Sequence, residues 1–241
     1  MRTLSVIIPA YNEERFIGRL LEKVLAVDLS EFDLEIEAVV IDDCSSDRTA
    51  EIAGAFEAVH LIRRTENGGK GEAVKLGIAE ANGDFLIIQD ADLEYDPNDY
   101  VPMLRALVEK DLDAVYGSRY MPDPERGWLY NFLHGKHAGQ SLPAYLGGRS
   151  LSIVAFVFTG RYLTDTVTAL KLFRRDVIKS LELVTHGFEL DHEITSRILA
   201  QHKSLEEVPI HYFPRSKGEG KKIGLSDWFE AVRTFARFRK G

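Results

Sequence analysis

The sequence predicts an α/β protein built on a mostly parallel β-sheet flanked by helices. Short, almost continuously apolar segments alternate with amphipathic segments through the first half of the chain, and the connections between them are short. Strands this apolar are typical of parallel sheets that are covered on both faces. Polar residues gather directly after several of these strands. Because ligands of such sheets bind beyond the carboxyl ends of the strands, these polar clusters form the candidate site.

The elements expected in the first half follow from hydrophobic spacing. The predicted strands are the apolar runs 4–9, 35–42, 58–63, 85–90 and 113–118. The predicted helices are 13–26, 45–53, 69–82 and 98–108. In the first helix Phe16, Leu20 and Val24 share one face, the second begins at Ser and Asp residues that can cap it, and Gly83 closes the third.

The second half departs from this alternation. Pro122, Pro124 and Gly127 mark a long irregular segment. The elements expected after it are a helix at 143–158, a strand leading into a helix at 168–178, a helix at 190–202, two short strands separated by Pro209, and a terminal helix at 226–239. We expect a single domain over residues 1–241, in which the second half is helical and irregular.

Composition excludes several classes of protein. The net charge of −8 disfavours a nucleic-acid partner, although residues 119–241 carry 19 bases and 13 acids and can therefore bind an anion locally. Cys44 is the only cysteine, so neither a disulfide nor a cysteine-based zinc site is expected. No apolar run approaches the ~20 residues of a membrane-spanning helix, and no signal-peptide pattern follows Met1. The cytoplasm is the expected compartment.

The stretch DFLIIQDADLEYDP, residues 84–97, drives an apolar strand into a group of carboxylates. Asp90 and Asp92 flank one residue at the strand end, and Glu94 follows two positions later. Such a stretch is either a solvated acidic turn or a site for a divalent cation, since like charges this close otherwise raise one another's pKa. Its place at a strand end favours a cation with oxygen ligands, Mg²⁺ or Mn²⁺.

Six segments in order resemble the family 2 glycosyltransferases of GT-A (Rossmann-like) fold, most closely the dolichol-phosphate-mannose synthase group and its bacterial polyprenyl-phosphate relatives. The segments are SVIIPAYNEE, VVIDDCSSDRT, NGGKGEAVKLGI, FLIIQDADLEYDP, GSRY and VPIHYFPRSKGEGKKIG. The resemblance implies a nucleotide-sugar-binding half at 1–118, an acceptor-side half at 119–224 and an amphipathic terminal helix at 225–241.

The resemblance also assigns roles to individual residues. Those that would bind the donor nucleotide are Pro9, Tyr11, Glu13, Ile41, Asp43 and Ala91. Those that would hold Mg²⁺ or Mn²⁺ are Asp90, Asp92 and, as a third ligand, Glu94. Arg119 would reach the sugar or a phosphate, and the basic pair Arg215 and Lys221 would bind the diphosphate.

Lys70 and Arg149 are two further basic candidates. Lys70 stands in NGGKGEAV, which is not a Walker phosphate loop; the segment is either a flexible helix start or a contact between Lys70 and the substrate. Arg149, after two glycines, is the best counterpart for a residue that grips the acceptor phosphate. In segment 160–176, which fits the family loosely, Ala169 and Lys171 replace the family's glycine and arginine.

The function implied is metal-dependent, inverting transfer of a hexose from a GDP- or UDP-sugar to a polyprenyl phosphate, dolichyl or undecaprenyl. One alternative is a family 2 enzyme that acts on a sugar or lipid hydroxyl, which needs a general base; Glu189, Asp191 and Glu193 are candidates. These acids are equally explained as the acidic first turn of a helix. A second alternative is a nucleotide-sugar-binding partner without turnover.

A polyprenyl phosphate acceptor requires contact with a membrane, so we expect peripheral association with its cytoplasmic face or a membrane partner subunit. In the terminal helix Trp228, Val232 and Phe235 fall on one stripe with basic residues nearby, as in an interfacial helix. The same stripe can instead dock on the protein's own core. The apolar segment 151–158 is the other candidate contact.

Overall fold

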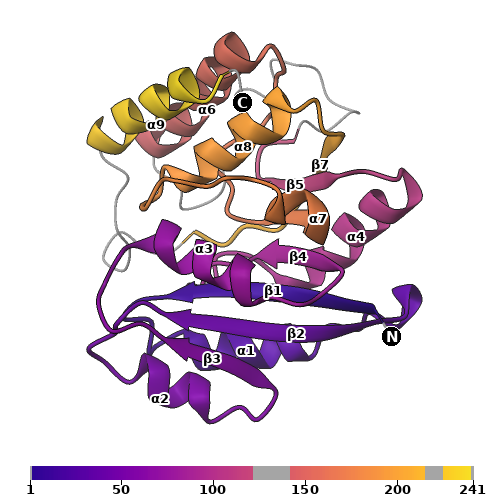
Figure 1. Cartoon of the computed structure of the whole chain (residues 1–241), viewed down its shortest axis with the longest axis vertical. Helices are drawn as coiled ribbons and strands as arrows, with labels where there is room; N and C mark the ends of the chain where they lie inside the picture. Colours follow the sequence, from indigo (N-terminus) through magenta and orange to yellow (C-terminus); the bar gives the residue numbers. More distant parts are fainter. Residues whose placement is uncertain (1, 122–141, 215–224, 240–241) are drawn as a thin grey trace.

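A seven-stranded sheet forms the centre of the molecule (Figure 1). The structure, a computed structural model, describes residues 2–121, 142–214 and 225–239. The strand order is β3-β2-β1-β4-β6-β5-β7, and all neighbouring pairs are parallel except the two that involve β6. The mostly parallel α/β sheet predicted from the sequence is therefore confirmed.

The observed elements match the predicted ones to within a few residues at most ends. The strands are β1 (Arg2–Ala10), β2 (Leu34–Asp42), β3 (Val59–Arg63), β4 (Phe85–Ile88), β5 (Ala114–Ser118), β6 (Lys171–Arg174) and β7 (Leu205–Pro209). The α-helices are α1 (Ile17–Leu25), α2 (Thr49–Gly54), α3 (Lys70–Glu80), α4 (Tyr100–Glu109), α6 (Leu142–Thr159), α7 (Arg175–Lys179), α8 (Leu190–Ala200) and α9 (Leu225–Arg237). The predicted strand after Pro209 is reduced to a single antiparallel bridge between Tyr95 and Tyr212.

Each face of the sheet is covered by its own apolar cluster. Leu20 of α1 and Leu104 of α4 pack on one face, and Val74 of α3 and Ile194 of α8 pack on the other. Successive residues of β1 alternate between the two clusters, as side chains of a strand must. Full burial of an aliphatic side chain contributes about 1.5–3 kcal/mol, so both layers hold the sheet firmly and fix the positions of its strand ends.

The antiparallel strand β6 lies between β4 and β5. Its register places Lys171 opposite Ile88, the last residue of β4, and opposite Tyr116 of β5. A strand that runs against its neighbours begins where they end. The inserted strand therefore carries a lysine from the second half of the chain to the carboxyl ends of strands from the first half.

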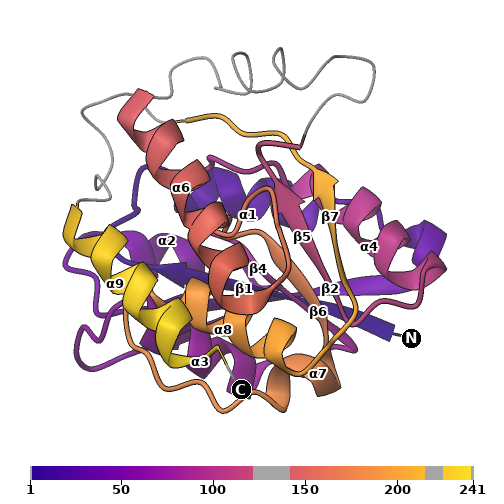
Figure 2. The ribbon, with the colours of Figure 1, turned by 90° about the horizontal axis from the view of Figure 1, so that it is seen from above.

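Helices α6 and α9 lie side by side at the end of the molecule opposite α2 and β3 (Figures 1 and 2). Ala231, Phe235 and Phe238 of the terminal segment are buried, and Trp228 Nε1 donates a hydrogen bond to Ser150 Oγ of α6 at 2.9 Å. Of the two interpretations of this stripe, docking on the protein's own core is the one the structure shows. In the described ranges, none of the helices combines the length and the apolarity needed to cross a bilayer.

Candidate active site

The carboxyl ends of β1, β2 and β4 meet along one edge of the sheet. The register aligns Ala10 with Asp42, and the Gln89 N–H that follows β4 donates to the Ile7 carbonyl oxygen at 2.9 Å. The polar segments after these strands, which are far apart in the sequence, are thereby adjacent. This is the convergence that the parallel arrangement predicts.

Each of these three segments contains a non-glycine residue in left-handed backbone conformation. They are Asn12 after β1 (φ 55°), Cys44 after β2 (φ 63°) and Leu93 after β4 (φ 61°). Such residues cost of the order of 1–3 kcal/mol and gather at functional sites, where the surrounding contacts hold them in place. At Asn12 the compensation is visible, because its Oδ1 accepts a hydrogen bond from the Ser46 N–H at 2.9 Å.

The residues assigned to the donor nucleotide differ in how accessible they are. The Tyr11 side chain is 49% exposed, and the Glu13 N–H is anchored to Thr49 Oγ1 at 2.8 Å. Pro9 is partly buried at the end of β1. The side chains of Ile41 and Ala91, by contrast, are 0% and 4% exposed and belong to the apolar clusters. Contact of these two residues with the nucleotide stays a prediction, and their burial favours contact through the main chain.

Asp43 organises the loop that precedes α3. Its carboxylate accepts hydrogen bonds from the Gly68 N–H at 3.1 Å and the Gly69 N–H at 2.8 Å, and it is paired with Arg64. The residue is 3% exposed. In this structure Asp43 therefore holds the start of α3 against the end of β2, and its contact with a nucleotide stays a prediction.

The carboxylates of the acidic stretch after β4 are partly exposed, and each is held by a contact with a neighbouring group. The Asp90 side chain is 26% exposed and its Oδ1 lies 2.8 Å from Lys70 Nζ. Asp92 Oδ1 accepts a hydrogen bond from the Glu94 N–H at 3.1 Å. The Glu94 carboxylate accepts one from the Tyr212 hydroxyl at 2.9 Å. Whether Glu94 serves as a third metal ligand stays a prediction.

The carboxylate oxygens of this stretch suit a hard cation that is also coordinated by ligands from outside the protein. Among the residues described, no three His, Cys, Asp or Glu side chains are clustered as a complete metal cage. Asp90 already attracts a positive charge, that of Lys70. Two carboxylates completed by water and substrate phosphates are the usual protein environment of Mg²⁺. Asp90 and Asp92 are thus the residues that would hold the ion.

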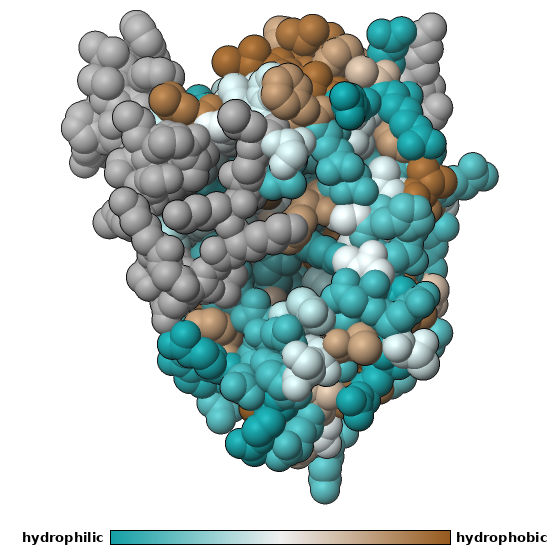
Figure 3. Space-filling view, turned by 90° about the vertical axis from the view of Figure 1, so that its left-hand side faces the viewer, coloured by the Kyte–Doolittle hydropathy of each residue, from teal (hydrophilic) through white to brown (hydrophobic). Residues whose placement is uncertain are grey.

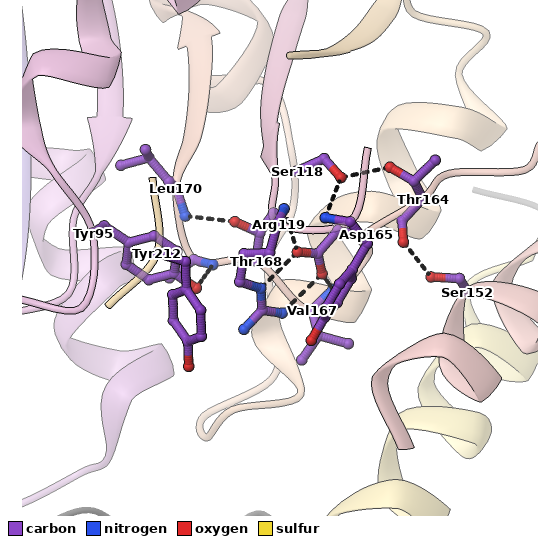
Figure 4. A network of polar contacts seen from close by, with 12 residues as sticks. Tyr95, Ser118, Arg119, Ser152, Thr164, Asp165, Val167, Thr168, Leu170 and Tyr212 are labelled. Carbon is purple, nitrogen blue, oxygen red and sulfur yellow. Dashed lines mark hydrogen bonds and ion pairs between the residues drawn. The ribbon is translucent and has the colours of Figure 1, made fainter. Parts of the chain in front are cut away.

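Arg119, directly after β5, is held by a buried carboxylate (Figure 4). Its Nε and Nη2 donate to the two oxygens of Asp165 at 2.6 and 2.8 Å, and the Asp165 side chain is 1% exposed. Burial opposes ionisation of Asp165, but the attraction of Arg119 outweighs it and keeps the pKa of that carboxyl below its usual value. The guanidinium lies over the rings of Tyr120 and Tyr212, at 5.3 and 5.1 Å. These contacts hold the positively charged Arg119 side chain beside the acidic stretch.

The carboxylate of Glu207 in turn orients the segment that carries Asp165. Glu207 of β7 accepts hydrogen bonds from the Thr164 and Asp165 N–H groups at 2.6 and 2.8 Å. The Thr164 hydroxyl also contacts Ser118 Oγ at 2.6 Å. Neither Asp165 nor Glu207 is assigned a role from the sequence. The only local signal was the loose match of segment 160–176 to the family.

Lys70 begins a chain of alternating charges that leads into the core. Its Nζ lies 3.4 Å from Asp191 Oδ2, and Asp191 Oδ1 lies 2.8 Å from Lys171 Nζ. Lys171 is 0% exposed. Burial by itself would raise the pKa of Asp191, but Lys171 and Lys70 lower it to about 2. In this structure Lys70 is paired with Asp90 and Asp191, and its contact with the substrate stays a prediction.

The other two candidate bases, Glu193 of α8 and Glu189 just before that helix, are also engaged. The Glu193 carboxylate accepts from the Thr185 N–H at 2.8 Å and from Arg197 Nε at 2.8 Å, and the residue is 0% exposed. Glu189 Oε1 accepts from the Gly187 N–H at 2.9 Å. Both carboxylates tie the loop before α8 to the start of that helix.

The remaining predicted residues belong to the second half of the chain. Arg149 of α6 is partly buried, and its Nη1 donates to the Thr164 carbonyl oxygen at 3.3 Å, next to the partner of Arg119. The Phe213 N–H donates to the Glu94 carbonyl oxygen at 2.8 Å, so the chain runs beside the acidic stretch just before residue 215. Arg215 and Lys221 themselves lie outside the described residues.

Comparison with known proteins confirms the resemblance to the family 2 glycosyltransferases. The chain is 33% identical to the dolichol-phosphate mannosyltransferase of Pyrococcus furiosus and 28% identical to the dodecaprenyl-phosphate galacturonate synthase of Rhizobium johnstonii, over 98% and 95% of its length. It spans 64% of the length of each relative. The glucosyl-3-phosphoglycerate synthase of Mycobacterium tuberculosis, solved with Mn²⁺, UDP and phosphoglyceric acid, has the same GT-A fold: TM-score 0.69, 20% identity, 99% of this chain and 78% of that one. Residues 5–181 match the family described as glycosyl transferase family 2, and the chain therefore belongs to that family.

Proposed function

We propose that this protein transfers a hexose from a GDP- or UDP-sugar to a polyprenyl phosphate, either dolichyl or undecaprenyl, with Mg²⁺ or Mn²⁺. Family membership supports the sugar transfer. The names of the two relatives above, which act on dolichol phosphate and dodecaprenyl phosphate, support the acceptor class. The strand-end site with Asp90, Asp92 and Arg119 supports a donor that carries a diphosphate.

The observation that carries the choice of acceptor is the state of the acids on α8. An acceptor hydroxyl has to lose a proton and needs a base, whereas a phosphate acceptor is already an anion near neutral pH. Asp191 is held between two lysines, and its pKa of about 2 makes it a poor base. Glu193 is buried and accepts hydrogen bonds from Thr185 and Arg197, and Glu189 accepts one from the Gly187 N–H. All three are committed to the protein, as a phosphate acceptor allows.

The residues then divide into a donor group and an acceptor group. Asp90 and Asp92 would hold the cation, which when bound stabilises the negative charge of the departing diphosphate. Arg119, fixed by Asp165, would donate to a phosphate or to the sugar, and Arg215 and Lys221 would add positive charge to the diphosphate. Arg149 would hold the acceptor phosphate so that its oxygen attacks the anomeric carbon as the bond to the diphosphate breaks on the opposite side, with inversion.

The test is a transfer assay with labelled donors. The full chain is incubated with Mg²⁺ or Mn²⁺, a polyprenyl phosphate and each of a panel of UDP- and GDP-sugars, and the label that enters the organic phase is counted. Transfer of one sugar to the lipid phosphate, with none to the matching prenyl alcohol, is the expected result. Transfer to an alcohol or a free sugar but not to the phosphate would replace this proposal with the hydroxyl-acceptor alternative.

The acceptor also requires a contact between this protein and a membrane, and we propose that α6 provides it. Leu146, Ile153, Phe156 and Val157, here called the α6 face, expose apolar side chains, Val157 to 71%. Figure 3 shows apolar side chains gathered at the end of the molecule where α6 and α9 lie. Helix α6 contains no acidic residue, and Arg149 is its one basic residue. An apolar face with a basic residue suits a membrane surface that presents anionic lipid, at the cytoplasmic face of the membrane.

Replacing Val157 by glutamate should weaken binding to vesicles that contain anionic lipid by about tenfold, because an apolar side chain is lost from the contact and a charge is placed there. Co-sedimentation of the full chain measures it. Val108→Glu is the matched control, since Val108 is 37% exposed and belongs to α4, which lies apart from α6 (Figures 1 and 2). Equal losses in the two variants would remove α6 from the contact.

A further inference from the structure

Lys70 lies between two carboxylates of the candidate site. Its Nζ is 2.8 Å from Asp90 Oδ1 and 3.4 Å from Asp191 Oδ2, and its side chain is only 14% exposed. The ring of Phe188 lies below the ammonium, at 5.7 Å. A lysine ammonium has three donors and strong hydration in water, so a position this dry is stable only with such partners. Lys70 is therefore a fixed positive charge beside a predicted metal ligand.

The backbone around Lys70 allows little movement. Gly69 has φ +89°, and a Cβ at Gly71 would lie 2.5 Å from the carbonyl carbon of His186. The Glu72 N–H donates to the His186 carbonyl oxygen at 3.1 Å. The start of α3 is thus pressed against the loop before α8. A change of partner by Lys70 therefore involves its side chain rather than the packed backbone.

Lys171 holds Asp191 in place from the buried side. Its Nζ is 2.8 Å from Asp191 Oδ1 and also donates to the Thr168 carbonyl oxygen at 2.5 Å. Asp191 thus keeps a positively charged partner whether or not Lys70 is near it. If Lys70 leaves Asp90, Asp191 still attracts it, at a distance that is already short.

We propose that Lys70 is a built-in competitor of the divalent cation at Asp90, so that the cation binds tightly only together with the donor diphosphate. An ammonium in contact with Asp90 repels a dication at the same carboxylate, since like charges within about 4–6 Å disfavour each other. The diphosphate changes this balance, because its oxygens accept hydrogen bonds from Lys70 and bind the cation at the same time. This inference rests on the proposed function, from which it takes the cation at Asp90 and Asp92.

The test measures Mn²⁺ binding to the full chain without any donor, by the electron paramagnetic resonance signal of free Mn²⁺. Lys70→Met should bind Mn²⁺ about tenfold more tightly than the unchanged protein, because the competing charge is gone. Lys70→Arg keeps the charge and should bind as weakly as the unchanged protein. Lys75→Met is the matched control, because Lys75 lies on the same helix and pairs with Glu72 at 2.5 Å. It should change the affinity less than twofold.

Addition of UDP or GDP separates the inference from the proposed function. The nucleotide should tighten Mn²⁺ binding strongly in the unchanged protein and by a smaller factor in Lys70→Met. Binding of Mn²⁺ by Lys70→Met that is equal to or weaker than that of the unchanged protein overturns the competition while leaving the cation site intact. No Mn²⁺ binding by either protein with UDP or with GDP overturns the cation site itself. Circular dichroism of each variant confirms that it is folded.

Discussion

Replacing Asp92 by asparagine should lower the rate of hexose transfer by roughly 10²–10⁴, the loss expected when several kcal/mol of charge stabilisation are removed from the departing diphosphate. The amide has the same shape as the carboxylate and can still accept from the Glu94 N–H as Asp92 does at 3.1 Å. The backbone of the acidic stretch should therefore stay as it is, and the loss should come from the missing charge. Initial rates at saturating donor and acceptor measure it.

Asp96→Asn is the control within the same stretch. Asp96 caps a short helical turn by accepting from the Asn98 N–H at 3.1 Å, and asparagine caps equally well. Its rate should stay within about twofold of the unchanged protein, since the side chain retains its acceptor and we assign it no role in the site. In addition, EDTA should abolish transfer and Mg²⁺ or Mn²⁺ should restore it. Full activity of Asp92→Asn, or of the unchanged protein in EDTA, would contradict the role of this residue in holding a cation.

The parts of the fold that sequence predicts well are those set by local patterns. Helix α1 follows from the spacing of Leu20 and Val24, and β1 from a continuous apolar run that is buried on both faces. The location of the site follows from the same pattern, because Asp90 and Asp92 come directly after a buried strand and parallel strands end at one edge.

The parts that escape prediction depend on contacts between distant segments. Nothing near Lys171 in the sequence shows that its strand runs antiparallel between β4 and β5, since the four residues of β6 are compatible with either direction. The partners Asp165 and Glu207 likewise resemble surface acids. A charged residue in a sequence is usually solvated, and only the fold reveals that these are buried and paired. For the same reason the sequence is compatible with two roles for Asp191, that of a general base and that of an acidic residue in the first turn of a helix.

Lys171 and Asp191, which lie beneath the candidate site, should be among the residues whose substitution lowers the free energy of unfolding most. Asp191→Asn leaves the ammonium of Lys171, which is 0% exposed, without its counter-charge at 2.8 Å. Removal of one partner from a buried ion pair costs about 3–5 kcal/mol. We expect a fall of that size in the free energy of unfolding of Asp191→Asn, measured by urea denaturation near neutral pH. The double variant Lys171→Met, Asp191→Asn should recover much of it, since an apolar side chain then replaces the unpaired charge.

The surface pair Lys110 and Glu206, 2.5 Å apart with side chains 55% and 40% exposed, supplies the control. Glu206→Gln should lower the free energy of unfolding by no more than about 1 kcal/mol.

The pKa of Asp191 determines how the stability difference between Asp191→Asn and the unchanged protein changes with pH. The pKa of Asp191 is lowered to about 2 from an ordinary value of 3.8, so its ionisation stabilises the fold above the ordinary pKa, and this stabilisation is lost as the pH falls from about 4 towards 2. The difference between Asp191→Asn and the unchanged protein should therefore shrink over that range. A cost as small as that of Glu206→Gln, or a difference that does not depend on pH below 4, would mean that Lys171 does not depend on Asp191 for its charge.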